Sequence, residues 1–515
     1  MPAKDYSKTC YNLTVKRYYL GFLKEVSSHK VLYSLLSLVL LCAVFIRVYR
    51  VDQILWFYFD QGRDALVIWD FWHNGKVFLV GPTTGIAGIF RGPWYYWLIA
   101  PMYLIGGGDP VWPAVFLSVL TVVAILFLYV LGKEIAGRGA GLIATVIAGF
   151  SYYIMIASRW LSNPTPMLLI SVLLVYSVFR VIGSRKPTKY WLVIGFLLGL
   201  AMQFGSAAEV FYFPTVLFVA IWKRKTVNKL IVISSLFIVV GTFLPQIIFD
   251  IRHQGILTAN IQKFLLEEGS FKLSFWEIVK IRFPFYWDVF TNKIWPGEPN
   301  LMKSAITLGF MTFVYNWREL LANRKFVILG LLVLSPLVGM LFFQGNYGNV
   351  YDYYFTGYYL VFILFFSVVL AQLFRAKSGW ILLVLFFGFF FRINLPLLRN
   401  FIIAGVDGST TVAFGNQKQA IDWVYEDAGG RQFSVDVYVP PVIPYAYDYL
   451  FTWYGPEKFG FKPSKDLVDP LYTIYEVDPP HPERLEAWMA RQKGIAVVEK
   501  EVRFGGITVQ KRKRI

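Results

Sequence analysis

The sequence predicts an α-helical protein that crosses a membrane many times and carries a soluble α/β domain at its C-terminal end. Of the 515 residues, 57% are hydrophobic and only 16% are charged. Apolar runs of about 20 residues recur along the chain, as transmembrane helices require. After about residue 398 these runs stop and alternating patterns take over. The net charge of +18 lies largely in short loops between apolar runs, so it indicates membrane orientation and no nucleic-acid partner.

The chain begins with a basic tail, residues 1–30, which is predicted to be cytoplasmic because lysine and arginine mark the cytoplasmic end of an apolar run. The first apolar run lacks a small-residue cleavage site and is predicted to be a retained anchor. Residues 31–397 are predicted to form a transmembrane domain of about eleven helices. The predicted spans are 31–49, 111–131, 139–157, 164–182, 190–205, 207–222, 230–249, 301–319, 326–343, 357–373 and 379–397.

The long loop after the first span, residues 50–110, is predicted to be extracytoplasmic. It contains the apolar segment Pro93–Ile105, which at about 13 residues is too short to cross and is typical of an interfacial or re-entrant helix. If this segment did cross, the basic loops that follow would face outward, against the positive-inside rule. The weakest span is 301–319, because Lys303 and Asn316 lie inside it. Its loss would reverse the orientation of everything downstream.

Residues 398–515 are predicted to form an extracytoplasmic α/β domain, long enough to bury a small core of its own. Alternation of apolar and polar residues predicts a strand at 433–439. The other expected elements are helices at 416–427, 443–454 and 482–491, a strand at 472–477, and a pair of strands within 494–511.

Chemistry is most concentrated in residues 56–97, where charged side chains stand among aromatics. Charges held at a membrane surface are functional more often than not, although an aromatic interfacial belt with solvated charges is the alternative. The outer ends of later spans add polar groups to the same face. These lie in 158–164, at Glu209, and in 250–253, 344–347 and 351–354. Residues 271–290 fit an interfacial helix or a lipid-facing doorway.

Three motifs resemble the GT-C glycosyltransferases. The sequence DQGR at 60–63 opens the first outer loop, FRGPWYYWLIAP follows at 90–101, and SRWLSNP lies at 158–164. Together they look most similar to the branch of protein O-mannosyltransferases and bacterial aminoarabinose transferases. That resemblance implies transfer of a sugar from a polyprenyl-phosphate carrier outside the cytoplasmic membrane, with inversion at the anomeric carbon.

The chain departs from the family pattern at three of these positions. Asp60 matches the catalytic aspartate of the family, while Gln61 stands where a glutamate is usual. Arg91 opens an Arg-Gly-Pro run in place of an acidic-Lys-Pro run. Asn163 precedes proline where the aminoarabinose enzymes carry aspartate. The residues establish no cofactor and no metal ligands, and a divalent cation stays open as an alternative.

The chemistry of such a transfer assigns roles to the charged residues. A hydroxyl nucleophile needs a positioned base, and the planar fork of arginine suits a phosphate leaving group. The predicted catalytic residues are Asp60, as general base, with Arg63 and Asp64. The predicted phosphate ligands are Arg91, Arg159 and Arg252. The predicted donor- or acceptor-binding residues are Asn163, Asp250, His253, Tyr351, Asp352 and Tyr354.

Each role has a structural alternative. Arg63 at helical spacing from Asp60 and Asp64 is able to serve only as their ion-pair partner. Arg159 fits an interface anchor, His253 fits a residue that orients its neighbour, and the tyrosines fit an aromatic belt.

The predicted partners are a polyprenyl-phosphate sugar donor, membrane lipids, and an acceptor that is protein, lipid or glycan. Two other functions stay open. A glycan polymerase or ligase also uses lipid-linked donors, but such enzymes place their long catalytic loop late in the chain. A flippase for lipid-linked sugars would need charges within the spans and broken helices.

Overall fold

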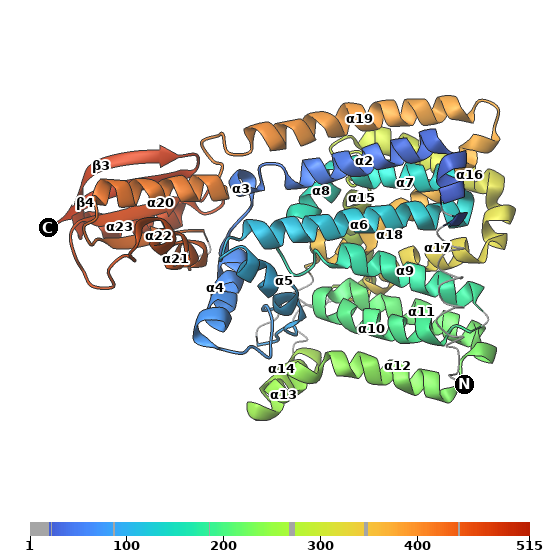
Figure 1. Ribbon diagram of the computed structural model, residues 1–515, viewed down its shortest axis with the longest axis horizontal. Coiled ribbons are helices and arrows are strands. Elements are labelled where there is room, and N and C mark those ends of the chain that lie inside the picture. The colour runs from blue at the N-terminus through green and yellow to red at the C-terminus, as the bar shows by residue number, and fades with distance from the viewer. Residues whose placement is uncertain are drawn as a thin grey trace, which may run out of the picture.

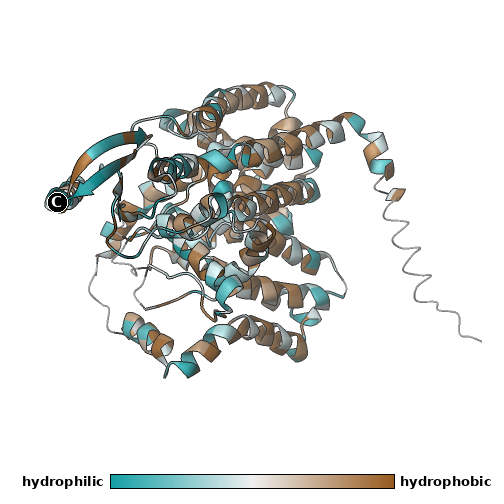
Figure 2. Cartoon of the chain, turned by 60° about the vertical axis from the view of Figure 1, so that its left-hand side comes forward, coloured by the Kyte–Doolittle hydropathy of each residue, from teal (hydrophilic) through white to brown (hydrophobic). Residues whose placement is uncertain are grey.

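The computed structural model describes residues 20–515 except 22, 86–87, 185, 267–272, 344–348 and 441–442. Apolar helices form a long bundle, and a small sheet with its own helices lies at one end of it (Figure 1). Hydrophobic residues dominate the bundle helices, while the C-terminal hairpin of β3 (Ala496–Phe504) and β4 (Ile507–Arg514) is mostly hydrophilic (Figure 2). The predicted class of helical membrane protein is therefore supported by the described part of the chain.

Within the described residues, four helical segments are each long and apolar enough to cross a membrane. They are α2 (Lys30–Val48), α6 (Val111–Ala136), Asp352–Arg375 with α18 (Thr356–Leu370) at its centre, and α19 (Gly379–Ala404). Three bent pairs also qualify by composition: α7 (Arg138–Phe150) with α8 (Tyr152–Arg159), α12 (Lys229–Thr242) with α13 (Leu244–Arg252), and α16 (Pro299–Ala322) with α17 (Arg324–Gly339).

Shorter apolar helices complete the bundle. They are α9 (Met167–Gly183), α10 (Thr188–Phe204), and η1 (Ala207–Phe211) continued by α11 (Tyr212–Trp222). All eleven predicted spans fall on these helices, but length and composition alone support four crossings, or up to seven if each bent pair is one span. The count of eleven stays a prediction. The α16–α17 pair bends by 116°, so the weakest predicted span is half of a sharply folded pair.

Two arginines at the predicted outer end of the first span, Arg47 and Arg50, cap helix C-termini. Arg47 of α2 is fully buried and donates to the carbonyls of Ala148 and Gly149 at the end of α7. Arg50 donates to Ile402 and Ile403 at the end of α19. The last carbonyls of a helix lack intrahelical donors and carry partial negative charge, so a guanidinium there is stabilising.

The segment between α2 and α6 is folded against the end of the bundle nearest the sheet (Figure 1). It contains α3 (Val51–Ile54), α4 (Phe59–Asn74) and α5 (Trp94–Ile105). Helix α4 ends at Gly75, whose left-handed φ of 65° favours glycine. Helix α5 has 12 residues, as expected for the short apolar segment at 93–105. Further along the chain, α15 (Phe275–Thr291) covers most of the predicted interfacial segment 271–290, and α14 (Ile256–Leu266) precedes it.

The last hundred residues form a four-stranded sheet of order β1-β2-β4-β3. The strands are β1 (Ser434–Tyr438), β2 (Leu471–Glu476), β3 (Ala496–Phe504) and β4 (Ile507–Arg514). β1 and β2 are parallel, in the register Ser434↔Leu471, and the other pairs are antiparallel. The accompanying helices are α20 (Phe414–Ala428), α21 (Tyr445–Thr452), α22 (Tyr454–Phe459) and α23 (Pro482–Lys493). The single helix expected over 443–454 is thus two short ones.

Helix α4 joins the bundle to this sheet region. A Cβ built on Gly62 would lie 2.3 Å from the backbone nitrogen of Ala446 in α21. Glycine is therefore required there for the two helices to approach. Gln417 of α20 donates to the carbonyl of Phe57, and the Tyr58 hydroxyl donates to the carbonyl of Val412. The start of α4 is held on both sides by residues from the C-terminal quarter of the chain.

Candidate functional site

The first turn of α4 carries an acid–arginine cluster, Asp60, Arg63 and Asp64. Arg63 bridges the two acids: its Nη1 lies 2.9 Å from Asp60 Oδ1, and its Nη2 lies 2.8 Å from Asp64 Oδ1. The side chain of Asp60 is 57% exposed and that of Asp64 is 6% exposed. The cluster therefore presents one carboxylate to solvent and keeps the other as a buried anchor for the arginine.

Asp64 is held by groups from two elements. Besides Arg63, the Tyr96 hydroxyl of α5 donates to Asp64 Oδ1 over 2.8 Å. Burial raises the pKa of Asp64 to about 6, and Arg63 and Tyr96 oppose that rise. Asp64 thus holds Nε and Nη2 of Arg63 on the buried side. The Nη1 group is left to contact Asp60.

Gln61, where the family pattern has glutamate, has a structural task at the helix start. Its side-chain oxygen accepts from the backbone nitrogen of Tyr58 over 3.1 Å, which satisfies a donor before the first turn. Its amide nitrogen donates to the carbonyl of Leu161 over 3.0 Å. A glutamate would make only the first of these bonds, because an ionised carboxylate cannot donate. The glutamine thus ties α4 to the 158–164 segment.

Two loop arms, residues 81–84 and 89–91, connect the cluster to Arg91. Thr83 and Phe90 pair as an antiparallel bridge, and the Arg91 backbone nitrogen donates to the carbonyl of Pro82. Arg63 Nη1 donates to Thr83 Oγ1 over 2.9 Å. Paired residues on neighbouring strands lie about 5 Å apart. The arms therefore place the backbone of Arg91 within a residue or two of the threonine that binds Arg63.

Arg91 points toward the start of η1. Its Nη2 donates to Ser206 Oγ over 3.2 Å. Burial lowers the pKa of Arg91, and the nearby Glu209 opposes that shift. Glu209 is itself buried and accepts from the backbone nitrogens of Ser206 and Gly357, which links η1 to α18.

Glutamine side chains support the loop arms from the end of α10 and the start of α13. Gln203 donates to Gln246 over 2.9 Å, and Gln246 donates to the carbonyl of Phe90 over 3.0 Å. A Cβ built on Gly92 would clash with the side-chain oxygens of Gln203 and Gln246, so a larger residue beside Arg91 would displace these glutamines. Asn163 is buried and donates to the carbonyl of Phe204 at the end of α10 over 2.7 Å. It is a helix cap as the structure places it.

A second ion pair, Lys293 with Asp352, lies at the start of the Asp352–Arg375 segment. The Lys293 Nζ is 2.8 Å from Asp352 Oδ2, and it lies over the rings of Tyr153 and Tyr359. The Tyr359 hydroxyl also donates to Asp352 Oδ1.

The other predicted binding residues are spread over different environments. Arg159 donates to the carbonyls of Ile46 and Tyr49 at the end of α2 and is occupied as a cap. Asp250 accepts from Leu257 and Thr258 at the start of α14. His253 stacks on Phe249 with ring centroids 4.0 Å apart.

Three more predicted residues lie at surfaces or in aromatic packing. Arg252 is exposed at the end of α13. Tyr351 stacks on Tyr353, and Tyr354 is buried against both rings. The predicted segment 344–347 lies outside the described residues. The structure therefore brings Asp60, Arg63 and Asp64 together, places the backbone of Arg91 on the paired loop arm, and gives Arg159 and Asp250 capping contacts.

Several residues that contact the site could not be identified from the sequence. Thr83, Ser206 and Lys293 are single polar residues without a motif, and Tyr96 is one of several adjacent aromatics in FRGPWYYW. Glu209 did stand out as an acid at the edge of an apolar run. In the described part of the chain, no group of three or more His, Cys, Asp or Glu side chains is placed to hold a metal ion.

Residues 91–249 match the family described as dolichyl-phosphate-mannose-protein mannosyltransferase. A search of curated proteins finds no match. Among solved structures, ArnT from Cupriavidus metallidurans in the apo state has a TM-score of 0.58 and 10% identity, over 94% of this chain and 98% of that chain. The same protein bound to undecaprenyl phosphate gives 0.56 and 10% identity, over the same shares of the two chains. AglB, the oligosaccharyltransferase of Archaeoglobus fulgidus, gives 0.45 and 13% identity, over 88% of this chain and 70% of that chain.

The resemblance to the GT-C glycosyltransferases of the O-mannosyltransferase and ArnT type is thereby confirmed. The chain shares its fold with ArnT over nearly the whole length of both proteins, and the family match begins at Arg91. Together they support the prediction that the chain is a glycosyltransferase. Asp60 lies outside the matched residues.

Proposed function

We propose that the chain transfers a sugar from a polyprenyl-phosphate donor to a hydroxyl of an acceptor, with inversion, at the end of the bundle that carries α4. One observation carries the proposal: the paired loop arms bind Arg63, the partner of the exposed Asp60, and carry Arg91. A transfer of this kind needs a base on one side of the anomeric carbon and a cation on the other.

In the proposed reaction Asp60 is the general base. The acceptor hydroxyl attacks the anomeric carbon, the bond from that carbon to the phosphate oxygen breaks, and the hydroxyl proton passes to the Asp60 carboxylate. Asp60 suits this role because it is the exposed acid of the cluster. Arg63 holds it in place, and Asp64 acts as a positioning residue that orients Arg63 from the buried side.

Arg91 is proposed to bind the phosphate that leaves. The guanidinium provides paired N–H donors for phosphate oxygens, and its fixed charge stabilises the charge that develops as the bond to the sugar breaks. Ser206, already bonded to Arg91, is placed to add a hydroxyl donor. Arg252, which is exposed, and Arg159, which is a cap, are weaker candidates for this task.

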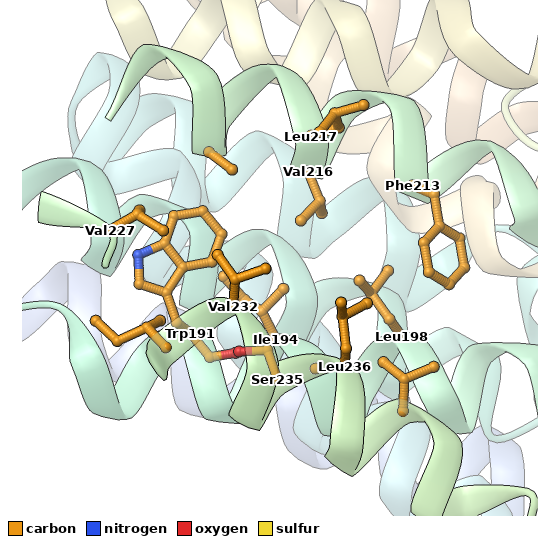
Figure 3. A pocket seen from close by; sticks show the side chains of 14 residues that line it. Trp191, Ile194, Leu198, Phe213, Val216, Leu217, Val227, Val232, Ser235 and Leu236 are labelled. Carbon is orange, nitrogen blue, oxygen red and sulfur yellow. The ribbon is translucent and has the colours of Figure 1, made fainter. Parts of the chain in front are cut away.

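An apolar groove between α10, α11 and α12 supports a lipid-linked donor (Figure 3). Its volume is about 180 Å³. Trp191 and Val227 lie toward one end of it, and Leu198 and Phe213 toward the other (Figure 3). One to two turns beyond Leu198 comes Gln203, which contacts Gly92. A prenyl chain in the groove would thus bring its phosphate to Arg91. ArnT, whose fold this chain shares, binds undecaprenyl phosphate.

The proposed location is the cytoplasmic membrane, with α4 and residues 398–515 on the extracytoplasmic side. The support is the charge of the loops, which favours this orientation over its reverse. Single cysteines at the exposed positions Lys76 and Lys493 should react with an impermeant maleimide on intact cells, after Cys10 and Cys42 are replaced by serine. A cysteine at Lys377 should react only after permeabilisation. The reverse pattern would contradict the orientation.

The function is tested with the full chain in lipid nanodiscs. We expect it to bind tritiated undecaprenyl phosphate. We also expect it to release polyprenyl phosphate from at least one member of a panel of radiolabelled polyprenyl-phosphate sugars. Failure to bind undecaprenyl phosphate would contradict the proposal whatever the natural sugar is. Binding without turnover of any donor would favour a carrier or flippase over a transferase.

A further inference from the structure

A second cavity, of about 360 Å³, lies between α4 and the sheet. Its walls come from four places: the residues just before and at the start of α4, the segment 410–412 before α20, the ends of β1 and β2, and the segment that leads into α21. The residues that define it here are Tyr58, Phe59, Val439, Pro440, Glu476 and Val477. The cavity falls in the range of about 300–1,000 Å³ that is typical of small-molecule sites.

The cavity occupies the position at which open α/β sheets bind ligands. β1 and β2 are parallel neighbours, and the cavity is lined by the residues that end or follow them, Glu476 and Val477 after β2 and Val439 and Pro440 after β1. Ligands of such sheets bind in the crevice outside the carboxyl ends of the strands. The cavity therefore lies where such sheets bind ligands, and Tyr58 and Phe59 of the α4 region close its other side.

One carboxylate, Glu476, is built into this crevice. The residue is 5% exposed. Both of its hydrogen bonds in the described structure are accepted by Oε1, from the Tyr447 hydroxyl over 3.0 Å and from Gln417 Nε2 over 3.5 Å. Burial raises the pKa of Glu476 to about 7. Among the described ion pairs none includes Glu476, so Oε2 is left to meet a donor that enters the cavity.

The crevice is fixed next to the proposed general base. Phe59, which lines it, immediately precedes Asp60 in the first turn of α4. Gly62 packs on the backbone of Ala446, which also lines the cavity, so α4 cannot shift without opening it. A molecule that reaches from the crevice past Phe59 would arrive at the exposed carboxylate.

We propose that this crevice binds a saccharide of the acceptor, with Glu476 accepting a hydrogen bond from one of its hydroxyl groups. The inference rests on the proposed function, because it assigns the crevice to the acceptor side of the same reaction. A pyranose ring offers apolar C–H faces to the proline and valine walls and several hydroxyls to a single carboxylate. An extended peptide would need a row of backbone partners, and the one buried charged group in the crevice does not supply them.

The test is saturation-transfer NMR on the full chain in nanodiscs. The probes are methyl α-mannoside, methyl α-glucoside, methyl β-galactoside and the peptide acetyl-Ala-Thr-Ala-amide. We expect saturation of at least one glycoside by the wild type and a loss of at least fivefold in Glu476→Gln. That variant keeps an oxygen for Tyr447 and Gln417, removes the charge, and replaces the Oε2 acceptor by an N–H donor. Ile443→Trp, at the exposed rim of the crevice, should reduce the signal without a buried change.

The matched control is Glu499→Gln, the same change at an exposed position of β3, on the far edge of the sheet. It should leave the glycoside signal unchanged. Equal glycoside binding by wild type and Glu476→Gln, or no glycoside binding by the wild type, would overturn the inference. Saturation transfer to the peptide alone would overturn the saccharide proposal and indicate a protein acceptor. Tritiated undecaprenyl phosphate should bind to Glu476→Gln as to wild type, so a failure of the donor proposal is seen separately.

Discussion

Two ion clusters in this molecule distribute burial in the same way, with a largely buried cation and a half-exposed outer carboxylate. In the acid–arginine cluster of α4, the cation Arg63 is 16% exposed and its outer partner Asp60 is 57% exposed. In the second pair, Lys293 is only 2% exposed and Asp352 is 49% exposed. Judged by exposure, the two outer carboxylates are almost equally available.

The two outer carboxylates, Asp60 and Asp352, differ in the number of hydrogen bonds that they accept. Asp352 receives Lys293 on both oxygens and the Tyr359 hydroxyl on Oδ1. Asp60, among the contacts of the described residues, receives Arg63 on Oδ1. A base needs a free lone pair directed at the proton it removes. The difference favours Asp60 over Asp352 as the proposed base, while Asp352 serves as the counter-charge of the buried Lys293.

The largest effect is expected for Asp60→Asn. The amide keeps the shape of the side chain and cannot accept the proton, so donor turnover should fall about 100- to 10,000-fold. Arg63 remains paired with Asp64, so the apparent melting temperature should change little. Turnover of a radiolabelled donor and tryptophan-fluorescence melting measure the two quantities. Near-normal turnover in Asp60→Asn together with inactivity in Asp64→Asn would assign the role of general base to Asp64, one helical turn further on.

Arg91→Lys is expected to lower turnover by about 100- to 1,000-fold, as the loss of one preorganised donor commonly does. A lysine keeps the charge but lacks the paired donors that match phosphate oxygens. Arg252→Lys is the matched control, because Arg252 is exposed at the end of α13. Wild-type turnover by Arg91→Lys would reduce Arg91 to an anchor of the loop arms.

Local features of this fold could be predicted from the sequence because they depend on neighbours. The apolar runs fall on helices, the short segment at 93–105 is α5, and Arg63 pairs with Asp60 three residues away. The strands at 433–439 and 472–477 are found within two residues of their predicted ends.

Contacts between distant residues could not be predicted. Arg50 caps a helix that ends more than 350 residues later, and Arg91 meets Ser206 across 115 positions. Arg159 looked like a phosphate ligand because only its charge is visible in the sequence, while its helix-capping contacts appear once α2 and α8 are packed together. The crevice at Glu476 likewise depends on two strands and α4 coming together.

The pH dependence of turnover should show the buried acid of the cluster. Burial raises the pKa of Asp64 to about 6, so its carboxylate is ionised above that pH and protonated below it. Protonation releases Arg63 from Asp64 and misplaces Asp60, and misplacement of a catalytic group costs up to about 100-fold. Turnover should therefore fall as the pH drops through about 6. Asp64→Asn should remove this limb, and an unchanged acid limb would assign it to another group.

The contribution of Asp64 to folding stability depends on pH in the opposite direction to its effect on turnover. The folded-state pKa of Asp64 lies above the ordinary aspartate value of 3.8, so the folded protein binds the proton more tightly than the unfolded chain does. The contribution of Asp64 to stability then falls as the pH rises from about 4 to 6. A melting temperature that rises between pH 4 and 6 in wild type relative to Asp64→Asn would contradict this reading of its environment.

Asp352→Asn should show the reverse of the Asp60 result. Its loss leaves the buried Lys293 without a full counter-charge. Breaking a buried pair costs about 3–5 kcal/mol, and the half-exposed position of Asp352 reduces this to roughly 1–3 kcal/mol. The apparent melting temperature should drop, while turnover of the folded fraction falls much less than in Asp60→Asn. A large turnover loss with unchanged melting would make Asp352 a site residue and end the contrast between the clusters.

The smallest expected effect is a change in donor affinity from filling the apolar groove. Ala220 lines the groove on α11, and Ala220→Phe would place a ring where the prenyl chain is proposed to lie. We expect the donor KM to rise about fivefold, equivalent to about 1 kcal/mol, with kcat unchanged because the loop arms are not touched. Ile233→Phe is the matched control, since Ile233 is 62% exposed and outside the groove. An equal rise of the donor KM in both variants, or a fall in kcat alone, would contradict the proposal that the groove binds the prenyl chain of the donor.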